Sequence, residues 1–148
     1  MRNVTAVVLA VAVGAITATA SESTRAIVGS YLEIHAALSA DKIDGVKSAA
    51  AAIVKEAERM GSTGEAIGKA ARAMEAASDL KAARAALGPL SDAVIAAAAA
   101  DGWKDVTDVK VGYCPMVDQH WIQKAGTVSN PYYGSAMLTC GELKDPGK

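Results

Sequence analysis

Residues 78–102, SDLKAARAALGPLSDAVIAAAAADG, decide the fold. Ser78-Asp79 is typical of a helix start and Asp101-Gly102 of a helix end. The apolar side chains between them recur every three or four residues and so share one helical face: Leu80, Ala83, Leu87, Leu90, Val94 and Ala97. Gly88-Pro89 interrupts this pattern, because proline lacks an amide donor and clashes with the preceding turn. We expect a kink there, with a new helix starting at Ser91 as the alternative.

Three stretches upstream have the same periodicity. The first covers about residues 22–38, and the second follows Asp41 as its N-cap and ends before Gly61. The third begins with Ser62-Thr63-Gly64-Glu65, which has the pattern of a capping box. Four helices with short connections predict an up-down antiparallel bundle. Alanine, which makes up 33 of the 148 residues, lets neighbouring helix axes approach closely.

The chain changes composition after residue 102. Both cysteines, both tryptophans, three of the four tyrosines and three of the four prolines lie beyond this point. A β-rich run ends at Tyr113, and residues 137–143 form a second short apolar run. Pairing of these runs predicts a two-stranded ribbon that brings Cys114 close to Cys140. We therefore expect a mostly α-helical domain, in which a four-helix up-down bundle at residues 21–102 carries a small C-terminal two-stranded β-ribbon at residues 103–148.

Residues 1–20 have the pattern of a secretory signal peptide. Arg2 supplies a positive start, residues 4–16 are apolar and uncharged, and Ala18-Thr19-Ala20 fits a cleavage site before Ser21. A membrane anchor is the alternative, but the apolar run is short for a span. We predict cleavage, export to the periplasm or beyond the bacterial envelope, and no stable membrane insertion of the mature chain. A disulfide is permitted in that compartment.

Several function classes find no support in the sequence. The net charge of −1 argues against a nucleic-acid binder, which normally has a basic surplus. The sequence contains no HExxH, CxxCH, ExxH or GxSxG motif and no phosphate-binding loop. We therefore expect a protein that is not an enzyme and that uses neither haem nor a nucleotide. His35 is expected to lie in solvent or at the edge of the core.

The tail concentrates sulfur and imidazole. Two thiols, two thioethers and one imidazole fall within 27 residues: Cys114, Met116, His120, Met137 and Cys140. Soft sulfur ligands select Cu(I) and Ag(I), and imidazole often accompanies them. Met137 and Cys140 would need a turn between them to reach one ion, because residues three apart in a strand face opposite sides.

A second interpretation of the tail stays open. In an exported protein the two cysteines commonly form a structural disulfide, which here would close Cys114 onto Cys140 and leave the methionines as packing residues. The protein would then be a non-metal interaction module of the cell envelope. Its docking surface would be formed by the tail aromatics, Trp121, Tyr132 and Tyr133.

Four blocks of the tail resemble the C-terminal signature of a bacterial family called domain of unknown function 3347. These blocks are Tyr113-Cys114-Pro115-Met116, Trp121, Asn130-Pro131-Tyr132-Tyr133-Gly134 and Met137-Leu138-Thr139-Cys140-Gly141. That family is exported and occurs alone or fused to periplasmic adaptors of copper and silver efflux pumps. The resemblance implies a metal-related role, with a copper or silver efflux adaptor or a periplasmic metal chaperone as partner. It implies four shared candidate ligands, Cys114, Met116, Met137 and Cys140, whereas His120 lies outside the shared blocks.

Overall fold

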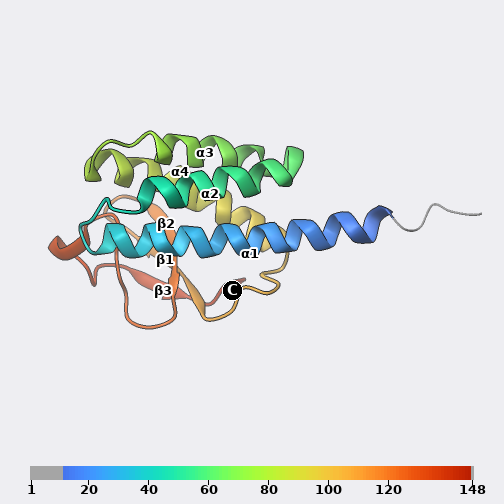
Figure 1. Cartoon of the computed structure of the whole chain (residues 1–148). Coiled ribbons are helices and arrows are strands. Elements are labelled where there is room, and N and C mark those ends of the chain that lie inside the picture. The colour runs from blue at the N-terminus through green and yellow to red at the C-terminus, as the bar shows by residue number, and fades with distance from the viewer. Residues whose placement is uncertain (1–11, 148) are drawn as a thin grey trace, which may run out of the picture.

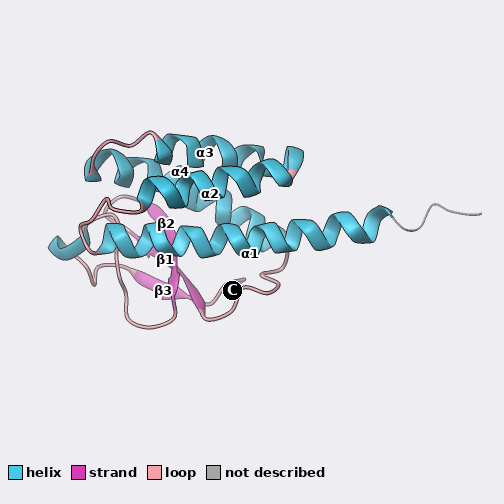
Figure 2. Cartoon of the chain, viewed as in Figure 1, coloured by secondary structure: helices cyan, strands magenta, loops and turns pink. Residues whose placement is uncertain are grey.

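The computed structural model describes residues 12–147 (Figure 1). Four helices come first: α1 (Ala12–Ser39), α2 (Val46–Arg59), α3 (Glu65–Glu75) and α4 (Leu80–Ala100). Three strands follow: β1 (Val109–Cys114), β2 (Gln119–Lys124) and β3 (Glu142–Lys144). Two short 3₁₀ segments, η1 (Gly61–Gly64) and η2 (Gly134–Ala136), precede α3 and β3. The sheet lies beside the helical layer, next to α1 and α4 (Figure 2).

The four predicted helices are confirmed. Consecutive helices pack side by side and α1 also packs against α4, so the apolar faces read from the sequence meet in one core. Asp79 is the N-cap of α4 and accepts a hydrogen bond from the Ala82 amide at 2.8 Å. Gly61 follows the end of α2 with φ 60°, as expected of a glycine just past a helix. The first eleven residues of the predicted signal peptide lie outside the described part of the chain, and α1 runs through the predicted cleavage site after Ala20.

Two predicted helix starts are wrong. Asp41 is not the N-cap of α2, because α2 begins at Val46 and its N-cap is Gly45. The Asp41 carboxylate instead accepts a hydrogen bond from Arg84. The capping box at Ser62–Glu65 does not form, since these residues enter α3 through η1 and no side chain caps the helix. Gly64 lies against the end of α2, because a Cβ at this position would lie 2.0 Å from the carbonyl oxygen of Ala57.

α4 continues through Gly88-Pro89, so the predicted alternative of a new helix at Ser91 is wrong. Gly88 also lets the sheet approach, because a Cβ there would lie 2.2 Å from Oε1 of Gln119. α4 is long and apolar enough to cross a membrane by length and composition. It packs against α1, α3 and β2, and its inner side chains are buried, as is typical of a core helix.

The predicted two-stranded ribbon is wrong, because the sheet has three antiparallel strands in the order β2-β1-β3 (Figure 2). β1 pairs first with β2, a strand that was not predicted from the sequence, and β3 lies at the other edge of β1. β2 reads QHWIQK and has three consecutive buried residues, Trp121, Ile122 and Gln123. Protein covers both faces of this strand, so the alternation of polar and apolar residues that marks a half-exposed strand is absent.

Candidate functional site

The two cysteines lie at the same end of the sheet. Cys114 is the last residue of β1 and is fully buried, whereas Cys140 is half-buried two residues before β3. Tyr113 pairs with Glu142, and one further step of this register places Cys114 opposite Gly141, the neighbour of Cys140. Both cysteines are free. Strand pairing therefore brings the backbone at Cys114 near the backbone at Cys140, and no covalent bond joins the two thiols.

The two methionines flank these cysteines and face solvent. Met116 lies in the connection between β1 and β2 with 62% of its surface exposed, and Met137 follows η2 with 36% exposed. The amide of Cys140 donates a 3.0 Å hydrogen bond to the carbonyl of Met137, which forms the turn that a shared site requires. Neither thioether belongs to the hydrophobic core. Both side chains are therefore exposed at the surface rather than used as core packing.

His120 does not join the sulfur residues. Its ring packs against Tyr113 with centroids 5.0 Å apart, and these two residues are cross-strand partners. Cys114 pairs instead with Gln119, and successive residues of a strand point to opposite faces, so His120 lies on the other face of the sheet. Within residues 12–147 no group of three or more His, Cys, Asp and Glu side chains is arranged to hold a metal. A metal site at the cysteines would thus depend on methionine sulfur.

The tail aromatics point into the protein. Trp121 is fully buried and donates a 3.0 Å hydrogen bond to Oε1 of Gln123. Tyr132 is 8% exposed, meets Trp121 edge to face at 6.3 Å, and donates a hydrogen bond to the carbonyl of His120. Tyr133 is half-buried. Two of the three residues of the predicted docking surface are therefore committed to internal packing.

Asn130 connects the block at residues 130–134 to the cysteine end of the sheet. Its fully buried side chain donates to the carbonyl of Cys140 at 2.8 Å and accepts from the amide of Tyr132 at 2.9 Å. Its own amide donates to the carbonyl of Leu138 at 2.7 Å. Two of these bonds hold the backbone around Cys140, at the carbonyls of Leu138 and Cys140. The block therefore positions a candidate ligand rather than supplying one.

An ion pair fastens the same loop to the helices. Arg84 of α4 donates to the carbonyl of Pro131 at 3.0 Å and to the Asp41 carboxylate at 2.6 Å. The amide of Ser135 donates to the other oxygen of Asp41 at 3.0 Å. The hydrogen bonds from Ser135 and Arg84 lower the pKa of Asp41 to about 2. Gly134 is required here, because its φ is 54° and a Cβ would lie 2.1 Å from Asp41 Oδ1.

A buried hydroxyl cluster joins α1, α4 and the loop. Tyr31 and Ser91 share a 2.6 Å hydrogen bond, and Tyr132 lies 3.4 Å from the Ser91 oxygen. Burial raises the pKa of both phenols far above the ordinary value, so they stay protonated. These hydroxyls therefore act as structural hydrogen-bonding groups.

His35 lies at the edge of the core, 7% exposed, and its Nε2 donates to the carbonyl of Ser129 at 2.8 Å. Burial lowers the pKa of His35 below its usual value of 6.5. The folded state therefore favours the neutral ring, and this stabilisation is complete above pH 6.5 and is lost as the pH falls through the lowered pKa.

We predict that the melting temperature falls between pH 7 and pH 5 and that His35→Gln removes most of this fall. Glutamine keeps an N–H donor for Ser129 but does not titrate. Thermal unfolding followed by circular dichroism across this pH range measures the effect. An unchanged pH profile in His35→Gln would show that other groups cause the fall, and His120→Gln, at an exposed position, serves as the control.

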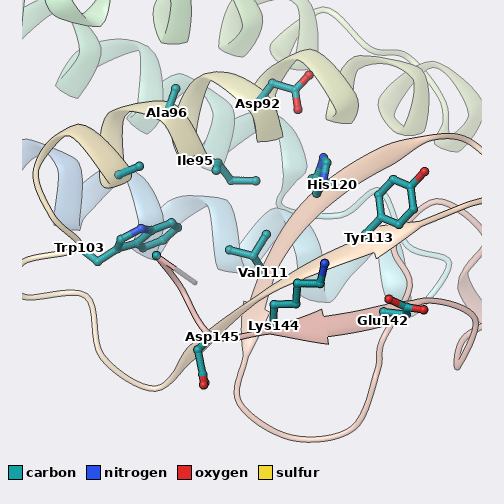
Figure 3. Close-up of a pocket in the computed structure, with 12 residues that line it drawn as sticks. Asp92, Ile95, Ala96, Trp103, Val111, Tyr113, His120, Glu142, Lys144 and Asp145 are labelled. Atoms are coloured by element: carbon teal, nitrogen blue, oxygen red, sulfur yellow. The ribbon is translucent and has the colours of Figure 1, made fainter.

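A separate cleft of about 620 Å³ lies between α4 and the sheet (Figure 3). Its wall includes Asp92, Ile95, Ala96 and Ala99, which share one face of α4 outside the core pattern. This cleft could not be predicted from the sequence, because it depends on how the sheet lies against α4. The feature of the sequence that pointed to it is the run of alanines near the end of α4, which occupies positions outside the buried face of the helix as well as on it.

Comparison with protein-family models, with curated proteins and with solved structures finds no match to this chain.

Proposed function

We propose that this protein binds Cu(I) or Ag(I) at the end of the sheet that carries its sulfur atoms. The observation that carries the proposal is the register of β1 and β3, which puts two free cysteines at adjoining positions with an exposed methionine beside each. Cys114 and Cys140 would supply thiolates, and Met116 and Met137 would supply thioethers. Two thiolates with two thioethers suit a soft monovalent ion and disfavour hard cations.

The surroundings support soft-metal binding at this place. Cys114 is enclosed by the core, whereas Cys140 and the methionines open toward solvent, so an ion would enter from the surface and be held against an apolar wall. Asn130 and the Arg84–Asp41 pair hold the loop that carries Met137 and Cys140. His120 is left out of the proposed ligand set, because its ring lies on the other face of the sheet.

The proposed setting is the bacterial envelope. The pattern of residues 1–20 and the resemblance of the tail to an exported family support it, and both remain predictions. In that setting the protein would buffer the ion or pass it to a copper or silver efflux adaptor or to a metal chaperone. It would do so as a carrier rather than as an enzyme.

The test is a Cu(I) titration of the reduced protein against a competing chelator. We expect Cys114→Ser/Cys140→Ser to weaken binding at least about 100-fold, or about 2.7 kcal/mol. We expect Met116→Leu/Met137→Leu, which keeps the side-chain volume, to weaken it about tenfold. Met60→Leu is the matched control, since Met60 lies at the end of α2 away from the sheet, and its affinity should not change.

Two outcomes would contradict the proposal. Binding by the native protein no tighter than by the double cysteine variant would exclude a site that uses the two cysteine thiolates. A Cys114–Cys140 disulfide in protein isolated without added oxidant, resistant to mild reductant, would favour the structural role of the two cysteines, because an oxidised pair cannot donate thiolates. Mass spectrometry after thiol alkylation distinguishes the bonded pair from free thiols.

A further inference from the structure

The cleft between α4 and the sheet has two apolar walls (Figure 3). Ile95, Ala96 and Ala99 form the wall on α4, and Val111 and Tyr113 of β1 form the opposite wall. The volume of about 620 Å³ falls within the roughly 300–1,000 Å³ of small-molecule sites. Small alanine side chains keep this space open, since any longer residue at positions 96 and 99 would extend into it.

Trp103 closes one end of the cleft. It follows α4 with a φ of 57°, and its amide donates to the carbonyl of Ala98 at 2.7 Å, so the backbone is held in place. The indole nitrogen is buried and has no hydrogen-bond partner among the described residues. Together with Tyr113 it lines the cleft with two aromatic rings, which favour apolar groups and nearby cations.

The other end of the cleft is acidic. Figure 3 shows Asp92, Tyr113, His120 and Glu142 toward this end, away from Trp103. Within the part of the chain that the structure describes, Asp92 and Glu142 have no ion-pair partner. Lys144 is the one lysine or arginine in the wall, against three carboxylates, and Lys110 binds the third of these, Asp145. The uncompensated charge at this end is therefore negative.

We propose that this cleft binds an amphipathic organic cation, with a compact apolar body against Trp103 and a protonated amine at the acidic end. The apolar walls select the body, because its burial removes hydrophobic surface from water. Asp92 and Glu142 select the charge, because a carboxylate attracts an ammonium group and repels an anion. The site lies on the face of the sheet away from Cys114, so this inference stands independently of metal binding.

The test compares two probes of nearly equal shape, 3-phenylpropylamine and 3-phenylpropanol, at neutral pH. Amide and indole chemical shifts of the isotope-labelled protein report where each probe binds and how tightly. We expect the amine to shift the Trp103 indole signal and the Val111 amide, and to bind at least about fivefold more tightly than the alcohol. That ratio is what two partly exposed carboxylate–amine contacts supply.

Three variants make the test specific. Asp92→Asn/Glu142→Gln should remove the preference for the amine and leave the affinity for the alcohol unchanged. Asp44→Asn/Glu65→Gln, which neutralises two exposed carboxylates outside the cleft, should leave both affinities unchanged. Ala96→Trp should abolish binding of both probes by filling the space.

Equal affinities for amine and alcohol would overturn the assignment of a cation. Shifts centred elsewhere, or a preference that survives Asp92→Asn/Glu142→Gln, would overturn the assignment of the site. The exposed positions of Asp92 and Glu142 ensure that this double variant still folds, and the alcohol titration verifies that the cleft is intact.

Discussion

Replacing Trp121 by alanine will lower the free energy of unfolding by about 4 kcal/mol. Trp121 is fully buried, donates to Gln123 and meets Tyr132 edge to face, so its removal leaves a large cavity where β2 meets the loop. The Gln123 oxygen keeps its hydrogen bond from the Ser129 amide, so the loss of stability comes chiefly from lost packing contacts. Chemical denaturation followed by far-ultraviolet circular dichroism measures the change.

Gly112 supplies a stringent test of the same packing. It is the cross-strand partner of Trp121, and a Cβ at this position would lie 2.2 Å from the indole ring. Gly112→Ala should therefore destabilise the native protein by about 3 kcal/mol through overpacking. In the Trp121→Ala background the same substitution should lower the free energy of unfolding only slightly, because the indole ring with which the added methyl group would clash is absent.

The double-mutant cycle thus predicts a coupling of about 2 kcal/mol or more between the two positions. Gly126→Ala is a useful comparison, since a Cβ there meets no atom within 4 Å but φ is 145°, so only backbone strain contributes. Additive effects of Gly112→Ala and Trp121→Ala would show that the close packing of this ring on the strand does not limit stability.

The helices could be predicted from the sequence because their signals are local. The three-four spacing of Leu87, Leu90 and Val94 depends on the helix alone, and Asp79 caps through a bond only three residues away. The start of α2 could not be predicted in the same way. Asp41 has the chemistry of an N-cap, but Arg84, 43 residues later in the chain, and Ser135 bind its carboxylate.

The residues of the candidate site could be proposed from the sequence, but their arrangement in space could not. The four sulfur residues were identified from composition, and the strand register puts the two cysteines at adjoining positions. His120 was grouped with them because proximity in sequence does not reveal strand pairing. Without β2 in the prediction, its side chain could not be assigned to the other face of the sheet. The cleft beside α4 depends on the same missing strand.

Replacing Asn130 by alanine will lower the free energy of unfolding by about 3 kcal/mol. The substitution leaves the carbonyl of Cys140 and the amide of Tyr132 without their partner, and each buried polar group without a hydrogen bond costs roughly 1–3 kcal/mol. Denaturation under the conditions used for Trp121→Ala allows a direct comparison. Asn130→Asp separates the two bonds, because the carboxylate still accepts from the Tyr132 amide but has no donor for Cys140.

Asn130 also connects stability to the proposed metal site. The carbonyl that its side chain holds belongs to Cys140, so Asn130→Ala frees the backbone that presents one thiol, whereas the bond from the amide of residue 130 to Leu138 remains. We therefore expect Asn130→Ala and Asn130→Asp to weaken Cu(I) binding under conditions where both variants remain folded. Ser48→Ala, which removes an exposed hydroxyl on α2, should change neither property. Full Cu(I) affinity in a folded Asn130→Ala protein would show that the loop does not need this anchor to present its sulfur atoms.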